Sequence, residues 1–335
     1  MIGYYAHHQG VGHVNRASAI ASAVDHPMTL LSTSASAADA FADRIPLHSD
    51  VEADDAGREP TANGALHYAP MHARGLQVRM NQITGWIRKA RPDAMIVDVS
   101  VEVALLARLC GVPVIAMAMP GERSDDAHQL GHRVATRVIA PWARSVYDPI
   151  WLRAVGSRVE YVGSFSRFAR RRAPAPTWPP RRITIMCGAG GTTFGPQHLD
   201  QLKAAVSRRW PTSSGGQDVE FTAVGGNAVW SDDVWGILCS ADLVLSHGGQ
   251  NAVAEIAAAR RPAILVAERR PHGEQEHTVR ALARAGIVQQ YADWTSVAGR
   301  VDEWKAGETS WDQWAPDDAL SRTAGVIDAV AAGRW

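Results

Sequence analysis

The sequence predicts an α/β protein with two doubly wound units, each built around a parallel sheet. Short apolar runs alternate with longer amphipathic stretches along most of the chain. The runs are almost continuously apolar, which is typical of parallel strands covered on both faces. The length of 335 residues exceeds what one hydrophobic core usually serves, so we expect two domains.

The expected strands fall into two sets, one in each half of the chain. Helical stretches lie between them, and this βα alternation is typical of doubly wound sheets. The first set is Ile2–His7, Met28–Ser32, Met95–Val99, Val114–Met119 and Val159–Val162, and the second is Ile183–Cys187, Val219–Val224, Leu243–Ser246 and Ala263–Ala267. The expected helices include Val14–Val24, Val101–Cys110 and Asn251–Ala259.

A stretch rich in arginine and proline separates the two sets of strands. Proline removes a backbone donor and stiffens the chain, so residues 167–182 are expected to form a linker. The predicted domains are therefore residues 1–166 and 183–315. Residues 316–335 form a helical pattern with no strand after it, and we expect this helix to pack back on the first domain.

Composition narrows the functional classes. The 34 basic residues balance the 34 acidic ones, which argues against a general nucleic-acid binder. Three widely separated cysteines without a CxxC pair fit a reducing compartment better than a disulfide scaffold or a zinc site. We find no signal-like start and no apolar run of about 18 residues. The expected location is the cytoplasm, and a peripheral contact with the inner face of the membrane stays open.

The turn after Leu243–Ser246 is the first candidate for a phosphate site. It reads His247-Gly248-Gly249-Gln250, and a helix is expected from about Asn251. Two glycines allow close approach of the backbone to a ligand, and a helix N-terminus offers free amide donors to a diphosphate. Glu255 falls off the expected buried face of this helix, where it can bind a ribose diol. A plain strand-to-helix turn with a favourable early charge explains the pattern about as well.

Two further stretches follow strands of the same half. Glu274 and Gln275 come just past Ala263–Ala267 and can bind the hydroxyls of a sugar ring. Gly190, Gly191 and Thr192 follow Ile183–Cys187 and suit phosphate, with Pro196 placed to open the next helix. Each is weak evidence alone, because early acids and glycine turns are common at helix starts. Three such features at one edge of one sheet are stronger.

The first domain offers a candidate base. His13 follows the first strand after Gly12, and its unperturbed pKa of about 6.5 suits removal of a proton from a hydroxyl. Asp98 ends another strand and can orient the imidazole. A capping or packing histidine is an equally good explanation. The pattern is not GxGxxG, so a dinucleotide site is disfavoured, and His7 and His8 lack the further ligands that a metal site needs.

These residues together resemble a known family. Residues 241–285, with His247-Gly248-Gly249, Glu255, Pro262 and Glu274-Gln275, look like the donor-binding half of GT-B glycosyltransferases. The likeness is greatest to the branch with the peptidoglycan N-acetylglucosaminyltransferase and UDP-glucuronosyltransferase-like enzymes. Gly10-Val11-Gly12-His13 resembles the first glycine loop of that branch. The resemblance implies two Rossmann-like domains that face a cleft.

The resemblance also implies roles for the candidate residues. Glu255 would bind the ribose, Glu274 and Gln275 the sugar, and the backbone around Trp230–Val234 the base. The diphosphate would be held by Gly190, Gly191, Thr192, His247, Gly248, Gly249, Gln250 and Asn251. His13 would act as base in an inverting transfer from an NDP-sugar, expected to be a UDP-sugar, to a hydroxyl acceptor, with Asp98 as its partner. No metal and no cofactor beyond the nucleotide sugar are implied.

The acceptor is less defined by the sequence. A loop over residues 66–80 is expected to face it, together with Gly12, and its candidate contacts are His67, Tyr68, Arg74 and Arg79. Lipid, glycan and natural-product acceptors all stay open. Thr278-Val279 stand where many relatives have Asn-Ala, so the sugar also stays open. Two alternatives remain, namely a sugar-nucleotide 2-epimerase on the same fold and a non-catalytic subunit of a partner enzyme.

Overall fold

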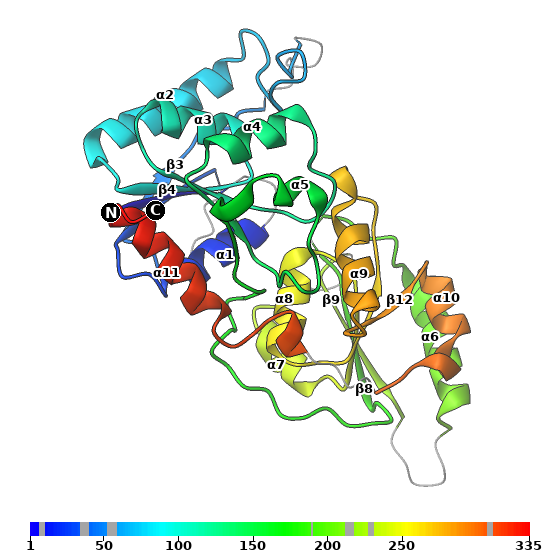
Figure 1. Cartoon of the computed structure of the whole chain (residues 1–335). Coiled ribbons are helices and arrows are strands. Elements are labelled where there is room, and N and C mark those ends of the chain that lie inside the picture. The colour runs from blue at the N-terminus through cyan, green and yellow to red at the C-terminus, as the bar shows by residue number, and fades with distance from the viewer. Residues whose placement is uncertain are drawn as a thin grey trace. The chain divides into compact units, whose positions relative to one another are not determined.

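A computed structural model describes residues 1–6, 11–33, 40–51, 59–188, 190–211, 218–226, 231–306 and 311–335. The chain divides into two compact units (Figure 1). The N-terminal unit comprises Met1–Arg144, Asp148–Gly163 and Asp318–Trp335. The C-terminal unit comprises Ser145–Tyr147 and Ser164–Asp317.

The N-terminal unit is built on a seven-stranded parallel sheet in the order β3-β2-β1-β4-β5-β6-β7. Successive strands are added outward from β1 in one direction and from β4 in the other, so the order reverses between these two strands. Ligands of open α/β sheets bind at such a reversal, beyond the carboxyl ends of the strands. The strands are β1 (Ile2–Ala6), β2 (Met28–Ser32), β3 (Asp43–Pro46), β4 (Ala94–Asp98), β5 (Val114–Met117), β6 (Arg137–Ala140) and β7 (Val159–Tyr161).

The helices of this unit connect the parallel strands. They are α1 (Val11–Ala21), α2 (Arg74–Ala90), α3 (Val101–Leu109), α4 (Asp126–Val134), the short α5 (Ile150–Arg153) and the C-terminal α11 (Ala319–Ala331). Helix α11 contacts α1 and β4, and Asp328 Oδ1 lies 2.7 Å from Nδ1 of His26. The end of the chain is therefore part of the N-terminal unit (Figure 1).

The C-terminal unit holds a five-stranded parallel sheet in the order β12-β11-β10-β8-β9. Its order reverses between β8 and β10. The strands are β8 (Arg182–Met186), β9 (Glu220–Val224), β10 (Leu243–Ser246), β11 (Ala263–Val266) and β12 (Gln289–Tyr291), and the helices are α6 (Pro196–Arg209), α7 (Val234–Ser240), α8 (Gln250–Ala258), α9 (Glu274–Arg284) and α10 (Trp294–Gly299). Buried aliphatic side chains of β8, β10 and β11 pack with Trp294 and Trp304 to form its core.

The structure confirms the α/β fold class and all nine expected strands, with bounds that differ by at most two residues. Three strands were missed, namely β3, β6 and β12. β3 is charged and largely exposed at a sheet edge, and β12 is only Gln289–Tyr291, so neither has the continuous apolar pattern of a central strand. The expected loop over 66–80 is wrong in its second half, because α2 begins at Arg74.

Residues 164–181 contain neither helix nor strand. The carboxylate of Asp242 holds this segment against the second sheet. Its Oδ1 accepts hydrogen bonds from the backbone N–H and hydroxyl of Thr177, and its Oδ2 accepts from the backbone N–H groups of Arg181 and Arg182. Within the described part of the chain, no helix is both long and apolar enough to cross a membrane.

Candidate functional site

In the N-terminal unit, His13 and Asp98 meet at the point where the strand order reverses. β1 and β4 pair with Ala6 opposite Asp98, so the end of β4 lies beside the start of α1. Nδ1 of His13 is 3.1 Å from Oδ2 of Asp98. His13 lies in the first turn of α1, because that helix begins at Val11 and not at Val14 as expected. His7, His8 and Gly10 lie outside the described residues.

Asp98 is fully buried and held by two further side chains. Arg16 Nη1 donates to Oδ1 at 3.0 Å, and the Tyr4 hydroxyl donates to Oδ2 at 2.9 Å. Burial alone would raise the pKa of Asp98, but the charge of Arg16 and the contacts with His13 and Tyr4 outweigh it and lower this pKa to about 2. Asp98 therefore carries its charge at neutral pH, accepts hydrogen bonds from Arg16 and Tyr4, and lies 3.1 Å from His13 Nδ1. A proton that His13 shares with Asp98 lies on Nδ1, which leaves Nε2 as the basic atom.

Sequence reasoning missed Arg16 and Tyr4. Arg16 follows His13 by three residues, and this spacing places both on one face of α1. That spacing was a usable signal, since a buried arginine needs a carboxylate partner. Tyr4 gave no local signal because it lies within the apolar run of β1.

Four acceptor candidates lie in two places: His67 and Tyr68 are held by Glu102 of α3, whereas Arg74 and Arg79 belong to α2. The backbone N–H groups of His67 and Tyr68 both donate to Oε1 of Glu102 on α3, and His67 Nε2 lies 3.1 Å from Oδ1 of Asp125. Arg74 is the exposed first residue of α2. Arg79 corrects the prediction, because it is fully buried and donates to the Tyr5 hydroxyl at 2.8 Å and to Thr33 at 2.6 Å. It is a core residue and does not face a ligand.

In the C-terminal unit, the turn between β10 and α8 lies at the second reversal point. Gly248 allows a close approach: a Cβ there would lie 2.4 Å from Val279 Cγ2 and 2.9 Å from the Gln275 carbonyl oxygen. Gly249 has space for a Cβ and begins α8 as its N-cap with an extended backbone. Helix α8 then begins at Gln250, one residue before the expected start at Asn251. The first N–H groups of an α-helix have no acceptor within the helix, and such a helix start suits the oxygens of a diphosphate.

The His247 side chain is buried and used within the unit. Nδ1 lies 3.0 Å from the Val266 carbonyl oxygen, which can only accept, so Nδ1 carries the proton. Nε2 then accepts from the Thr192 hydroxyl at 2.8 Å. Burial lowers the pKa of His247, which keeps the ring neutral. His247 therefore ties the β10 turn to the loop that follows β8.

Glu268 holds the same loop and was missed by sequence reasoning. Its Oε1 accepts from both the backbone N–H and the hydroxyl of Thr193 at 2.6 Å, and it lies 3.4 Å from His247 Nε2. Arg270 Nη2 donates to the Gly191 carbonyl oxygen at 2.9 Å, and Gly191 has a left-handed backbone with φ of 90°. Gly190 and Gly191 are exposed. Glu268 follows β11, so the strand-end rule could have found it.

Glu255 differs from the expectation. It is 6% exposed, so it lies on the buried face of α8 and not beside it. Arg167 Nε donates to its Oε1 at 2.9 Å. Burial raises the pKa of Glu255, and Arg167 offsets part of that rise. Arg167 comes from the expected linker, 88 residues away, where no local pattern marks it.

The sugar candidates lie at the start of α9. Glu274 is its first residue, after the short helical turn Pro271–Gly273. Gln275 is buried, and its Oε1 accepts from the Glu268 backbone N–H at 3.0 Å. The structure thus gathers Gly191, His247, Glu268 and Gln275 at one sheet edge. Residues 227–230, which include Trp230, lie outside the described part of the chain.

Residues 222–303 match the glycosyltransferase family 28 C-terminal domain. This segment contains both the β10–α8 turn and the start of α9. The chain has the GT-B fold, and this segment of it resembles the C-terminal domain of glycosyltransferase family 28. It is 32% identical to a UDP-N-acetylglucosamine–N-acetylmuramyl-(pentapeptide) pyrophosphoryl-undecaprenol N-acetylglucosamine transferase of Clavibacter sepedonicus, over 57% of this chain and 55% of that one.

A second curated relative has the same description, from Halorhodospira halophila, and is 28% identical over 54% of this chain and 53% of that protein. The chain spans about half the length of the curated relatives it matches.

Solved structures share the fold over nearly the whole chain. The glycotransferase of kitacinnamycin superposes with a TM-score of 0.68 at 13% identity, covering 98% of both chains. Acinetobacter baumannii MurG gives 0.63 at 14% identity, again over 98% of both chains. A Phytolacca americana UGT2 complexed with UDP-2fluoro-glucose and pterostilbene gives 0.62 at 15% identity, over 100% of this chain and 98% of that one. These likenesses confirm the GT-B architecture.

Proposed function

We propose that the protein transfers a sugar from a nucleoside diphosphate sugar, expected to be a UDP-sugar, to an acceptor hydroxyl with inversion. The observation that carries this proposal is the glycine turn between β10 and α8 at the strand-order reversal. There Gly248 lies against Gln275 and Val279 of α9. The names of the curated relatives, both UDP-sugar transferases, support the same class of donor.

In this proposal the donor is held in the C-terminal unit. The α8 amides beyond Gly249 and the exposed Gly190–Gly191 backbone bind the diphosphate, and Asn251 and Gln250 lie at the same helix start. His247 and Thr192 act by positioning the loop, because each uses its side chain on the other. Glu255 keeps one carboxylate oxygen for the ribose while Arg167 binds the other. Glu274 and Gln275 read the sugar.

His13 supplies the base in the N-terminal unit. Its Nε2 removes the proton of the acceptor hydroxyl as that oxygen attacks the anomeric carbon and the nucleoside diphosphate leaves. The Asp98 carboxylate stabilises the imidazolium that forms on His13. Helix-end amides offset the charge on the leaving diphosphate, so no metal is required for this step. A cytoplasmic location and a peripheral membrane contact stay predictions.

Donor binding is the test. Ligands that bind only the folded state raise its melting temperature, so the protein is screened against UDP, dTDP, GDP and CDP, with NAD and ATP as controls. A rise with one nucleoside diphosphate that is lost in Glu255→Ala supports the proposal. The same rise in Glu255→Ala as in the wild type contradicts the donor-site assignment. Sugar scrambling without any acceptor would point to the epimerase alternative instead.

A further inference from the structure

A small cavity opens in the N-terminal unit beyond the carboxyl ends of β4 and β5, against α3 and α4. Its volume is about 50 Å³ and one side is open. Most of its wall is apolar, formed by Val97, Val101, Ala104, Ala116, Met117 and Met119. Such a volume holds an alkyl group or the edge of a ring, since a whole benzene occupies a cavity of about 150 Å³.

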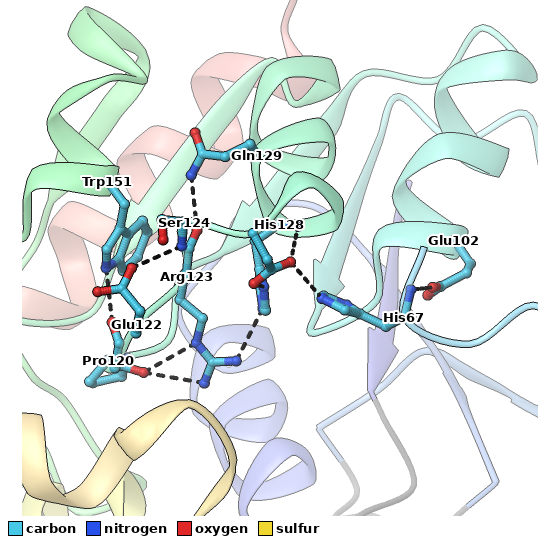
Figure 2. A network of polar contacts seen from close by, with 11 residues as sticks. His67, Glu102, Pro120, Glu122, Arg123, Ser124, His128, Gln129 and Trp151 are labelled. Atoms are coloured by element: carbon cyan, nitrogen blue, oxygen red, sulfur yellow. Dashed lines mark hydrogen bonds and ion pairs between the residues drawn. The ribbon is translucent and has the colours of Figure 1, made fainter. Parts of the chain in front are cut away.

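The polar side chains at its rim are engaged with one another (Figure 2). Arg123 donates through Nε and Nη2 to the Pro120 carbonyl oxygen at 3.3 and 3.2 Å, and its Nη1 lies 3.1 Å from Nε2 of His128. A guanidinium only donates, so Nε2 of His128 accepts and the ring proton lies on Nδ1. That Nδ1 donates to Oδ2 of Asp125 at 2.6 Å. Arg123, the guanidinium on the cavity wall, thus holds His128 in its neutral form with the proton on Nδ1.

Two histidines on the wall are uncharged at neutral pH. Burial lowers the pKa of His128 to about 3, and the charge of Arg123 opposes its protonation further. Burial, with Arg123 again, lowers the pKa of His132 to about 4. His132 stacks on Trp151, and in the described part of the chain its buried Nδ1 has no hydrogen-bond partner. A ligand hydroxyl that donated to this nitrogen would satisfy a buried acceptor that otherwise lacks a partner.

The wall of the cavity is continuous with the His13–Asp98 pair. Arg16 Nη1 donates to Asp98 and also lies 3.7 Å from Sδ of Met119, a wall residue. Val99 lines the cavity directly after Asp98, with a left-handed φ of 70°. This backbone is strained for a β-branched residue and occurs mainly at functional sites. The end of β4 therefore lies between the candidate base His13 and a group bound in the cavity.

We propose that this cavity binds an uncharged, apolar end of the acceptor, and that a phosphate-bearing group is excluded from it. The proposal rests on the proposed function and deepens it by naming the acceptor class. Aliphatic walls favour an apolar group because binding removes apolar surface from water on both sides. A phosphate would lose its hydration there, and donors on the wall are already engaged, Arg123 with Pro120 and His128 and the Ser100 hydroxyl with Glu102.

The test compares a neutral probe with its matched phosphate ester. Binding of p-cresol and of 4-methylphenyl phosphate to the full-length protein is measured by NMR titration at pH 7.5, without nucleotide. Ala116→Leu fills the cavity from β5, where the half-buried Ala116 leaves room for the larger side chain, and Ala116→Val is a milder second variant. Ala154→Leu, on the exposed end of α5 outside the cavity, is the matched control.

We expect p-cresol to bind the wild type and Ala154→Leu equally, and to bind Ala116→Leu at least about tenfold more weakly, the equivalent of ~1.4 kcal/mol. The phosphate ester should bind more weakly than p-cresol. Equal or tighter binding of the ester, no binding of p-cresol, or unchanged p-cresol binding in both folded Ala116 variants would each overturn the proposal. UDP binding is measured in the same samples. If UDP binding is absent while p-cresol binds as expected, the proposed function fails, and the cavity keeps its preference for a neutral apolar ligand but loses its assignment as an acceptor site.

Discussion

The carboxylate of Asp98 contacts His13 at 3.1 Å through Oδ2 while its other oxygen accepts from Arg16 at 3.0 Å. One buried carboxylate thus serves a candidate base and a permanent cation. The two contacts differ in the role proposed for them, because only His13 is proposed as the catalytic base.

Replacing His13 with alanine should lower kcat by about 10²–10⁴-fold and leave UDP affinity near the wild-type value, because a general base acts in the transition state. Steady-state kinetics and calorimetric UDP titration check this. The control is His48→Ala, an exposed histidine of the same unit that bonds to the Ser49 carbonyl oxygen. Turnover by His13→Ala equal to that of the control would rule out the base assignment.

Asp98 should also contribute to stability in a pH-dependent way. Its pKa is lowered from its usual value of 3.8 to about 2 in the folded state, so the unfolded chain binds the proton more tightly. The contribution is fully present above about pH 4 and is lost as the pH falls toward 2, and it amounts to ~2 kcal/mol. Urea unfolding should therefore show the difference between wild type and Asp98→Asn shrinking over that range. A difference that stays constant between pH 5 and 2.5 would contradict the lowered pKa.

The sequence predicts the central strands because their apolar runs are continuous, and it predicts the glycine turns because both follow such strands. It does not predict the pairing of long side chains. Arg167 meets Glu255 across 88 residues and Arg16 meets Asp98 across 82, and neither distance appears in a local pattern. Arg79 shows the opposite error, since an arginine expected to face a ligand is buried against Tyr5. Burial of one charged residue depends on a partner that the chain brings from elsewhere.

Adjacent glycines in the β10–α8 turn provide a matched pair. Gly248→Ala should destabilise the fold by ~1–3 kcal/mol, because its Cβ would overlap Val279 Cγ2 and the Gln275 carbonyl oxygen. Gly249→Ala should cost much less, since its Cβ meets only Gln275 Nε2 at 3.7 Å. Adding Val279→Ala to Gly248→Ala should restore only part of the lost stability, because the overlap with the Gln275 carbonyl oxygen remains. Urea unfolding of the four proteins checks this, and equal stability of the two glycine variants would contradict it.

Glu268 should act on donor binding through the loop it holds. Glu268→Ala removes the acceptor of both Thr193 hydrogen bonds, so residues 190–193 lose an anchor and UDP should bind about tenfold more weakly. Glu268→Gln keeps one acceptor oxygen and should recover part of the affinity. Calorimetric titration with UDP measures both variants. If alanine and glutamine behave identically, the charge of Glu268 matters and its hydrogen bonds to Thr193 do not.

Arg167 should determine the pH range over which the donor binds. Burial raises the pKa of Glu255 and the Arg167 guanidinium partly offsets this, so Arg167→Ala should raise that pKa further. A ribose diol donates to the ionised carboxylate, so UDP affinity in Arg167→Ala should fall as the pH is lowered from 8 to 6, by about three- to tenfold more than in wild type. Arg172→Ala is the matched control, because that exposed arginine pairs with Asp317 and not with Glu255. If both variants bind UDP with the same pH dependence, Glu255 does not bind the ribose in its charged form, and the donor assignment must be redrawn around the α8 amides alone.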